Sequence, residues 1–243
     1  MMIKKIVTLL HAKFEQPGYV SNWASQNNFE LEEIHCWKNP EYPDPKDVDR
    51  LLIMGGPMSV YQAIDYPWML DEIRFIRAVI DAGNKVLGIC LGSQLISAAM
   101  GAKVFPNAEP EIGWFEINWN NAAYEHPLTY GVSSHSKVFH YHGDTFDLPE
   151  NAVLLASSKA CLNQAYALGD NVLALQFHME INHELLEDML FHGDEIVQDN
   201  YVQPVKKIRD GIYDVMQNHT DLATLLENLY CKSIIQTVEK SMI

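Results

Sequence analysis

A cysteine stands between two glycines in the segment GICLG at residues 88–92, where the apolar run at residues 85–89 ends. The residues that follow, 93–100, have the apolar spacing of a helix, so the segment predicts a strand-to-helix turn. Flanking glycines allow the sharp turn that lifts the central side chain out of a sheet, and the first N–H groups of a helix favour a thiolate. Cys90 is therefore a candidate nucleophile, with the N–H of Leu91 facing the atom that the sulfur attacks. A buried cysteine that only packs in the core is the alternative interpretation.

A histidine and a glutamate occur two residues apart in the segment QFHME at residues 176–180, at the end of an apolar run. Residues i and i+2 of a strand face the same side, so we expect the His178 ring and the Glu180 carboxylate to lie side by side. A carboxylate that accepts from one ring nitrogen fixes the tautomer and leaves the other nitrogen for a thiol. Together with Cys90, this pair supplies the base and the orienting group that a cysteine nucleophile needs.

Two glycines and a proline follow the short apolar run at residues 50–54, in the segment GGP at residues 55–57. Glycine N–H groups at the carboxyl end of a strand can donate to an oxyanion. The segment is a candidate oxyanion-binding loop, and a plain turn is the alternative.

The elements that must position these segments alternate between strands and helices in the first hundred residues. Apolar patterns predict strands at residues 3–10, 28–37, 50–54 and 85–89, and helices at residues 68–82 and 93–100. This alternation implies right-handed crossovers and a largely parallel sheet with helices on both faces. Closely spaced strand patterns from residue 112 to residue 178 predict an antiparallel extension of the sheet. Helices are expected at residues 183–192, about 201–217 and about 221–237.

The expected architecture is an α/β fold with three layers, a mostly parallel open sheet, an antiparallel extension and C-terminal helices. We expect one domain over residues 1–195 and a helical C-terminal extension over residues 196–243 that packs on the same domain.

The composition is acidic, with 32 Asp and Glu against 17 Lys and Arg and a formal net charge of −15. Such a field repels polyphosphate, so we expect neither nucleic acid nor an anionic membrane surface as the main partner. The uncharged run at residues 86–102 contains three glycines, two serines and a glutamine, which argues against a membrane span. No CxxC motif and no signal-like segment occurs, so reduced thiols and a cytoplasmic location are expected.

Six segments in order make the chain resemble the class I (triad) glutamine amidotransferases, and within them a stand-alone group similar to the glutaminase part of GMP synthase. The segments span about residues 50–180 and read LLIMGGPMSV, VLGICLGSQLISAAMGAKV, EIGWF, YHGDTFDLP, NQAYAL and LALQFHME. The resemblance implies the flavodoxin-like fold of that family.

The resemblance also implies a role for individual residues. Cys90 would be the nucleophile, His178 the acid–base and Glu180 its orienting group. The N–H groups of Gly56 and Leu91 would bind the oxyanion. The implied substrate contacts are Gln94, Tyr141, His142 and Gly143, although the family usually has Ser-His where this chain has Tyr-His.

A metal site is an alternative use of the histidines, because His-x-His and His-x-Glu have plausible ligand spacing. Its ligands would be His140, His142, His178 and Glu180. It leaves the cysteine between glycines unexplained, so we expect no metal and no cofactor.

The sequence thus predicts a glutamine amidotransferase that cleaves the γ-amide of glutamine through a γ-glutamyl thioester and releases ammonia. No SGGxDS loop of an ATP-pyrophosphatase occurs, so the ammonia acceptor is unidentified, and the implied partner is a synthetase or acceptor subunit. A free-standing γ-glutamyl peptidase or hydrolase with the same triad is the alternative, which the C-terminal helices favour slightly. A non-catalytic binding protein of the same fold is the third hypothesis, against which the complete triad speaks.

Overall fold

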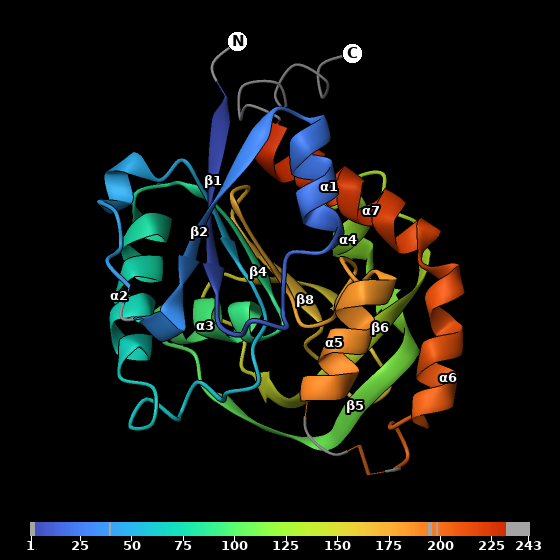
Figure 1. Cartoon of the computed structure of the whole chain (residues 1–243). Coiled ribbons are helices and arrows are strands. Elements are labelled where there is room, and N and C mark those ends of the chain that lie inside the picture. Colours follow the sequence, from blue (N-terminus) through green and yellow to red (C-terminus); the bar gives the residue numbers. More distant parts are fainter. Residues whose placement is uncertain (1–2, 39, 194–195, 198, 232–243) are drawn as a thin grey trace, which may run out of the picture.

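The computed structural model describes residues 3–38, 40–193, 196–197 and 199–231. The strands in these residues form a single sheet (Figure 1): β1 (Lys4–Leu10), β2 (Phe29–His35), β3 (Arg50–Ile53), β4 (Lys85–Ile89), β5 (Val104–Trp119), β6 (His135–Phe146), β7 (Val153–Ser157), β8 (Ala165–Leu168) and β9 (Val172–Leu175). The α-helices are α1 (Tyr19–Gln26), α2 (Trp68–Asp81), α3 (Leu91–Ala99), α4 (Asn121–Glu125), α5 (His183–His192), α6 (Val205–Asp210) and α7 (Met216–Leu226).

The strand order is β2-β1-β3-β4-β9-β8-β7-β5-β6. Neighbours from β2 to β9 pair in parallel, and neighbours from β9 to β6 pair antiparallel, as the two sequence patterns predict. The carboxyl end of β4 lies between those of β3 and β9 inside the parallel half. Ligand sites of open α/β sheets form at such carboxyl ends.

Helices cover both faces of the sheet (Figure 1). On one face, α1 and α7 pack against it through buried residues that include Trp23, Leu222 and Leu226. On the other face, α2 and α3 bury a second cluster that includes Ile76 and Leu95. The apolar residues of these helices recur at helical spacing, so each helix has one face to bury against the sheet.

A third, smaller cluster lies at the antiparallel end of the sheet, where α5 and α6 pack on β5 and β6. Trp114 of β5 donates from its indole nitrogen to the carbonyl oxygen of Ile208 at 2.8 Å. This contact ties α6 to the strands that reach the pocket described below.

The helices after α5 differ from the predicted ranges. Pro204 disfavours helix in the residue before it, so α6 begins at Val205 and not near residue 201. The helix ends at Asp210. An added Cβ on the next residue, Gly211, would lie 2.2 Å from the Trp114 ring, and a 3₁₀ turn that begins there leads into α7. The predicted helix at residues 221–237 is described only as far as Cys231, because residues 232–243 lie outside the described residues. The proposed boundary between residues 195 and 196 stays a prediction.

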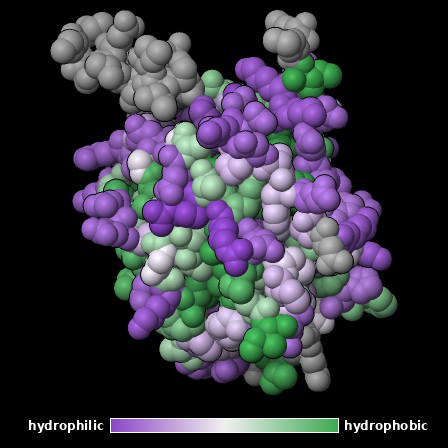
Figure 2. Space-filling view, turned by 90° about the vertical axis from the view of Figure 1, so that its left-hand side faces the viewer, coloured by the Kyte–Doolittle hydropathy of each residue, from purple (hydrophilic) through white to green (hydrophobic). Residues whose placement is uncertain are grey.

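The surface beside α2 is largely hydrophilic in its upper half, as Figure 2 shows. Exposed apolar side chains in the loop before α2 and in its first turn include Tyr61, Ile64 and Leu70. Within the part of the chain that the structure describes, no helix combines the length and the apolar character needed to cross a membrane. The cytoplasmic location stays a prediction.

Replacing Gly92 at the start of α3 should destabilise the fold. An added Cβ would lie 2.1 Å from the carbonyl oxygen of Ile53 in β3, which is backbone and cannot move aside. We expect Gly92→Ala to lower the free energy of unfolding by about 2 kcal/mol or more, measured by urea denaturation at pH 7. Gly143→Ala is the matched control, because its Cβ would have no neighbour within 4 Å. Equal losses in the two variants would contradict the close-packing argument.

Candidate active site

Cys90 occupies the turn between β4 and α3 in a backbone conformation that L residues rarely adopt, with φ 52° and ψ −111°. Its N–H donates to the carbonyl oxygen of Leu175 at 2.8 Å, which ties the turn to β9. Its carbonyl oxygen accepts from the N–H groups of Ser93 at 3.0 Å and Gln94 at 3.3 Å. Conformations of this kind cost about 1–3 kcal/mol and persist where the surroundings fix them. The turn has the strand–cysteine–helix form that the sequence predicted.

A pocket of about 290 Å³ opens beside this turn. It brings together seven of the predicted site residues: Gly56, Cys90, Leu91, Gln94, Tyr141, His142 and Gly143. The Cys90 side chain is only 6% exposed, and its thiol donates to the carbonyl oxygen of Tyr141 at 3.8 Å. The thiol is therefore buried in the wall of a small pocket and points toward β6.

His178 and Glu180 form a buried pair, with His178 Nδ1 donating to Glu180 Oε1 at 2.6 Å. The apolar pattern predicts a strand that continues to residue 178, but β9 ends at Leu175. A two-bond bridge to β6 holds the pair instead: the N–H of His178 donates to the Phe139 carbonyl at 2.8 Å, and the Phe139 N–H donates back at 3.3 Å. The antiparallel half of the sheet thus positions this pair beside the parallel half that carries Cys90.

The charge of Glu180 governs the protonation of His178. Burial lowers the pKa of His178, but the negative charge of Glu180 and the neighbouring Cys90 side chain outweigh it, so the pKa lies well above its ordinary value. The Nε2 atom is buried and has no hydrogen-bond partner among the described residues. The thiol is near enough to raise the pKa of the imidazole, although its hydrogen bond goes to the Tyr141 carbonyl oxygen. The raised pKa makes Nε2 a stronger base, which favours transfer of the thiol proton to it.

Gly56 and Leu91 lie against one another at the pocket. An added Cβ on Gly56 would lie 2.8 Å from Leu91 Cδ2 and 2.7 Å from Met58 Sδ, so both side chains pack closely on this turn. Leu91 is the first residue of α3, and the first N–H groups of a helix have no partner within the helix. Two backbone amides are thus available near the Cys90 thiol.

The four predicted substrate contacts line the same pocket from two elements. Gln94 lies in the first turn of α3 and donates from Nε2 to Gln176 Oε1 at 3.1 Å. Tyr141, His142 and Gly143 come from β6. The His142 ring is fixed because its Nδ1 donates to the carbonyl oxygen of Asp144 at 3.0 Å.

Sequence reasoning missed two further residues, one that lines the pocket and one behind the Gly56 turn. Glu15 lines the pocket and is 6% exposed. Burial raises its pKa to about 7, against the opposing charges of His178 and His11. His11 lies beside the Gly56 turn, with its Cβ 2.8 Å from where a Gly56 Cβ would stand. His11 directly follows β1 and Glu15 lies in the loop after it. Polar residues at the carboxyl end of a buried strand are the signal that could have identified them.

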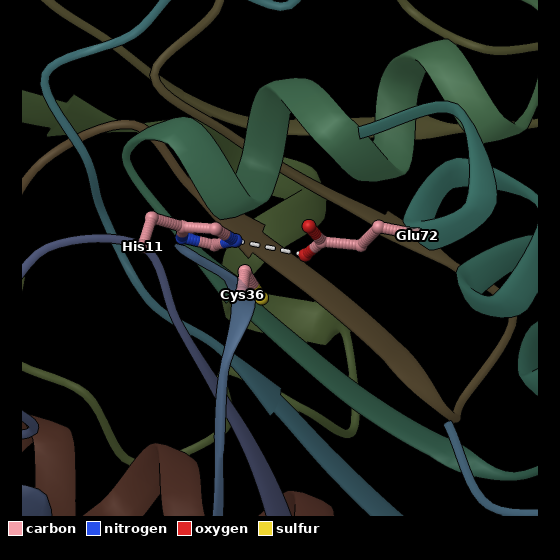
Figure 3. Close-up of side chains that lie close together, drawn as sticks. All are labelled: His11, Cys36 and Glu72. Carbon is pink, nitrogen blue, oxygen red and sulfur yellow. Dashed lines mark hydrogen bonds and ion pairs between the residues drawn. The ribbon is translucent and has the colours of Figure 1, made fainter. Parts of the chain in front are cut away.

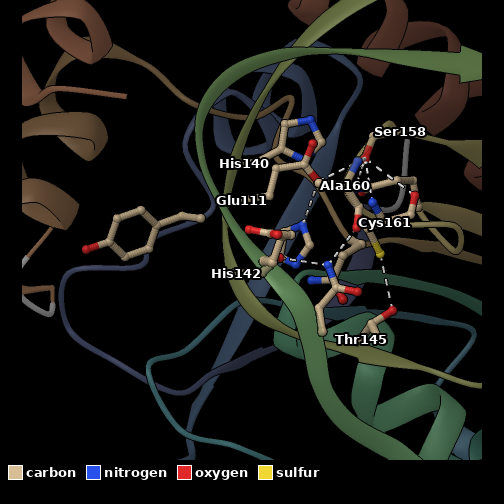
Figure 4. A network of polar contacts seen from close by, with 12 residues as sticks. Glu111, His140, His142, Thr145, Ser158, Ala160 and Cys161 are labelled. Carbon is tan, nitrogen blue, oxygen red and sulfur yellow. Dashed lines mark hydrogen bonds and ion pairs between the residues drawn. The ribbon is translucent and has the colours of Figure 1, made fainter. Parts of the chain in front are cut away.

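The alternative metal site is not assembled as predicted. His178 pairs with Glu180, whereas His140 and His142 lie around Glu111 of β5, at 3.5 and 3.4 Å from its Oε2 (Figure 4). That oxygen already accepts hydrogen bonds from Ser158 at 3.0 Å and Gln164 at 2.7 Å. Among the described residues, Glu111, His140 and His142 are one of two groups close enough to hold a metal, and His11, Cys36 and Glu72 are the other.

A family model described as class-I glutamine amidotransferase matches residues 7–196. The glutamine amidotransferase-like protein YfeJ of Salmonella typhimurium is 31% identical to the chain over 216 residues, which cover 86% of the chain and 90% of YfeJ. Gamma-glutamyl peptidase 4 of Arabidopsis thaliana is 34% identical over 188 residues, or 74% of each protein. The glutamine-hydrolysing GMP synthase of Thermomicrobium roseum is 31% identical over 65% of the chain, and the chain spans 27% of that enzyme.

The fold is similar to that of a glutamine amidotransferase from Thermotoga maritima. The TM-score is 0.82 at 24% identity, and the superposition covers 93% of this chain and 98% of that one. The comparisons confirm the predicted resemblance and fold class. They do not test the roles of individual residues.

Replacing His140 should make the fold less sensitive to acid. Burial lowers the pKa of His140 to about 3, whereas an unfolded-chain histidine has a pKa of about 6.5. Between these values the unfolded chain binds the extra proton, so stability is lost as the pH falls through this window. Because of this residue, the free energy of unfolding of the wild type should be about 3 kcal/mol lower at pH 4.5 than at pH 7. His140→Phe should lack this part of the decrease.

Urea unfolding at pH 7 and pH 4.5 measures the difference. His135→Phe is the control, because His135 is exposed on the same strand and should keep the wild-type pH dependence. A wild-type acid response in His140→Phe would show that His140 is not held neutral.

Proposed function

Because the chain belongs to the class-I glutamine amidotransferase family, we propose that it cleaves the γ-amide of glutamine with a cysteine nucleophile and releases ammonia. Cys90 is the nucleophile, His178 the acid–base and Glu180 the group that orients its ring. Relatives named as glutamine-hydrolysing GMP synthases and gamma-glutamyl peptidases support amide hydrolysis in general.

One observation carries the proposal. The buried hydrogen bond of 2.6 Å from His178 Nδ1 to Glu180 leaves Nε2 beside the thiol at a strained strand-to-helix turn. A purely structural ion pair needs no thiol at its open nitrogen, and a purely structural cysteine needs no strained backbone. The two features together support nucleophilic catalysis.

In the first step, the thiol proton moves to His178 Nε2 while Cys90 Sγ bonds to the γ-carbonyl carbon of the substrate. The carbonyl electron pair moves onto oxygen, which faces the N–H groups of Gly56 and Leu91. Removing one such donor in other enzymes costs about 3–4 kcal/mol of transition-state stabilisation, so a fixed backbone pair is a large contribution.

In the second step, the oxyanion collapses and the C–N bond breaks. His178 gives its Nε2 proton to the leaving nitrogen, and a γ-glutamyl thioester remains on Cys90. A water molecule then gives a proton to Nε2 and attacks the thioester, and the released sulfur takes that proton back. Glu180 stays ionised and holds the ring throughout.

The remaining pocket residues bind the rest of the substrate. Gln94 lines the pocket that holds the γ-glutamyl group, and the backbone of residues 141–143 contacts the end that carries its α-amino and α-carboxyl groups. No metal and no cofactor takes part in this mechanism. The ammonia acceptor is unidentified, and a synthetase or acceptor subunit is the partner that this function implies.

A free-standing γ-glutamyl peptidase with the same triad is the second candidate function. The match to gamma-glutamyl peptidase 4 covers 74% of both proteins, whereas the match to a GMP synthase covers 27% of that enzyme. The chemistry differs only in the leaving group, which is an amine in place of ammonia.

Hydrolysis should depend on Cys90 and should distinguish the two candidates. The purified protein is incubated with glutamine and with a set of γ-glutamyl peptides, and ammonia, amine and glutamate are measured. We expect Cys90→Ala to lose activity below detection on every substrate, because the acyl group then has no carrier. An electrophilic glutamine analogue should label Cys90 and no other cysteine.

Cys161→Ala is the matched control, because Cys161 is also buried but does not line the pocket. It should keep the wild-type kcat. Full hydrolysis by Cys90→Ala would refute the mechanism. Ammonia from glutamine alone would favour the amidotransferase, and faster release of amines from peptides would favour the peptidase.

Removing metals should leave hydrolysis unchanged. Dialysis against EDTA and a second chelator should alter kcat/KM by less than about twofold, because each proton transfer uses His178. Metal analysis of the dialysed protein is the control. A loss of activity that zinc or another divalent ion restores would contradict the metal-free mechanism.

A further inference from the structure

Figure 3 shows a second buried imidazole–carboxylate pair, His11 with Glu72. His11 also contacts the Gly55 carbonyl of the candidate oxyanion loop. His11 follows β1 and Glu72 lies on α2, and His11 Nε2 is 2.8 Å from Glu72 Oε1. Both side chains have no exposed area. The proposed reaction uses neither residue, so this pair has no explanation so far.

Both ring nitrogens of His11 face acceptors. Nδ1 lies 3.0 Å from the carbonyl oxygen of Gly55, and Nε2 faces the Glu72 carboxylate. A neutral imidazole donates from one nitrogen only, so two such contacts require the imidazolium when Glu72 is ionised. Burial lowers the pKa of His11, but the negative charge of Glu72, its hydrogen bond to the ring and the neighbouring Cys36 side chain outweigh it and hold the pKa well above its ordinary value.

The ring is fixed in position as well as in protonation. It stacks on the indole of Trp68 with the ring centroids 5.7 Å apart and an interplanar angle of 19°. The direction of the Nδ1–H bond is therefore set by Glu72 on one side and by Trp68 on the ring face.

The carbonyl group that His11 binds and the N–H of Gly56 belong to one peptide unit. The unit is planar and trans, so its C=O and N–H bonds point in opposite directions. Fixing the Gly55 oxygen toward His11 therefore fixes the Gly56 N–H away from His11. A charged donor on the oxygen also polarises the amide and makes its N–H a stronger donor.

Other restraints on this peptide are weak. An added Cβ at Gly56 would lie 2.8 Å from His11 Cβ, so this position favours glycine, whereas one at Gly55 would meet only the end of the Glu15 side chain. Two adjacent glycines have the widest choice of backbone conformations, and a rotation of the peptide between them would turn the N–H away. A hydrogen bond to the Gly55 oxygen opposes that rotation.

We propose that His11, paired with Glu72, is a positioning residue that holds the Gly55–Gly56 peptide with its N–H directed at the oxyanion of the Cys90 reaction. The proposal rests on the proposed function, which supplies the oxyanion. Cys36 belongs to the same cluster but does not bind the Gly55 oxygen.

His11→Phe should lower kcat for γ-glutamyl substrates by roughly tenfold to a hundredfold, somewhat less than the loss of an oxyanion donor itself. KM should change by less than about twofold, because the contact acts on the transition state. His11→Asn should recover part of kcat, because an amide nitrogen can still donate to the Gly55 oxygen. Glu72→Gln should lower kcat the least of the three variants, because a neutral His11 can still donate from Nδ1 to the Gly55 oxygen.

Alkylation of Cys90 by iodoacetamide separates positioning from general damage. This displacement forms no oxyanion, so the alkylation rate should stay within about twofold of wild type in each variant while kcat falls. Cys36→Ala is the matched control within the cluster and should keep both rates. Equal losses of kcat and alkylation rate, or equal kcat in His11→Phe and His11→Asn, would overturn the proposal.

A crystal structure of His11→Phe tests the same point without turnover. We expect the Gly55 oxygen to leave its wild-type direction and the Gly56 N–H to turn from the pocket. An unchanged peptide would overturn the positioning role. If His11→Phe does not fold, the same comparison is made with His11→Asn and Glu72→Gln. Failure of wild-type hydrolysis on all substrates would instead refute the proposed function, and the crystal structure would still decide what His11 orients.

Discussion

The backbone of Cys90 is the constraint on which the rest of the site depends. A positive φ at a residue with a side chain is unfavourable, and it persists here because both neighbours of the turn are packed against backbone. An added Cβ on Gly92 would lie 2.1 Å from the Ile53 carbonyl oxygen of β3, and one on Gly88 of β4 would lie 2.6 Å from the Gly92 carbonyl oxygen. The helix α3 therefore starts in contact with the sheet, and the thiol has one direction in which to point.

Buried imidazole–carboxylate pairs flank this turn on two sides. His178 with Glu180 lies on the side of β6, and His11 with Glu72 lies on the side of α2. Taking two charges out of water costs several kcal/mol per ion, and apolar replacements of similar shape are often neutral or stabilising. Fold stability alone therefore does not account for these pairs. The proposed reaction, which moves a proton and builds charge on a carbonyl oxygen, gives both pairs a use.

Segments far from the Cys90 turn hold the residues that lie beside it. The bridge between Phe139 and His178 joins the last parallel strand to the antiparallel half, and Trp114 joins that half to α6. The family match ends at residue 196, yet Leu222 and Leu226 of α7 have no exposed area and share a core cluster with α1. The chain beyond the matched region is thus part of the packing that supports the sheet.

The sequence by itself determined the features that local spacing encodes. Two glycines around Cys90 predict the turn, and the separation of two residues between His178 and Glu180 predicts their contact. Apolar periodicity located the strands, but it extended the strand before His178 too far, because a bridge to β6 continues the extended backbone. Only the tertiary structure decided that His11 binds the Gly55 oxygen and that His140 faces Glu111. These partners lie on separate strands and loops, and their contact depends on strand order, register and the helix that covers them, which local spacing does not specify.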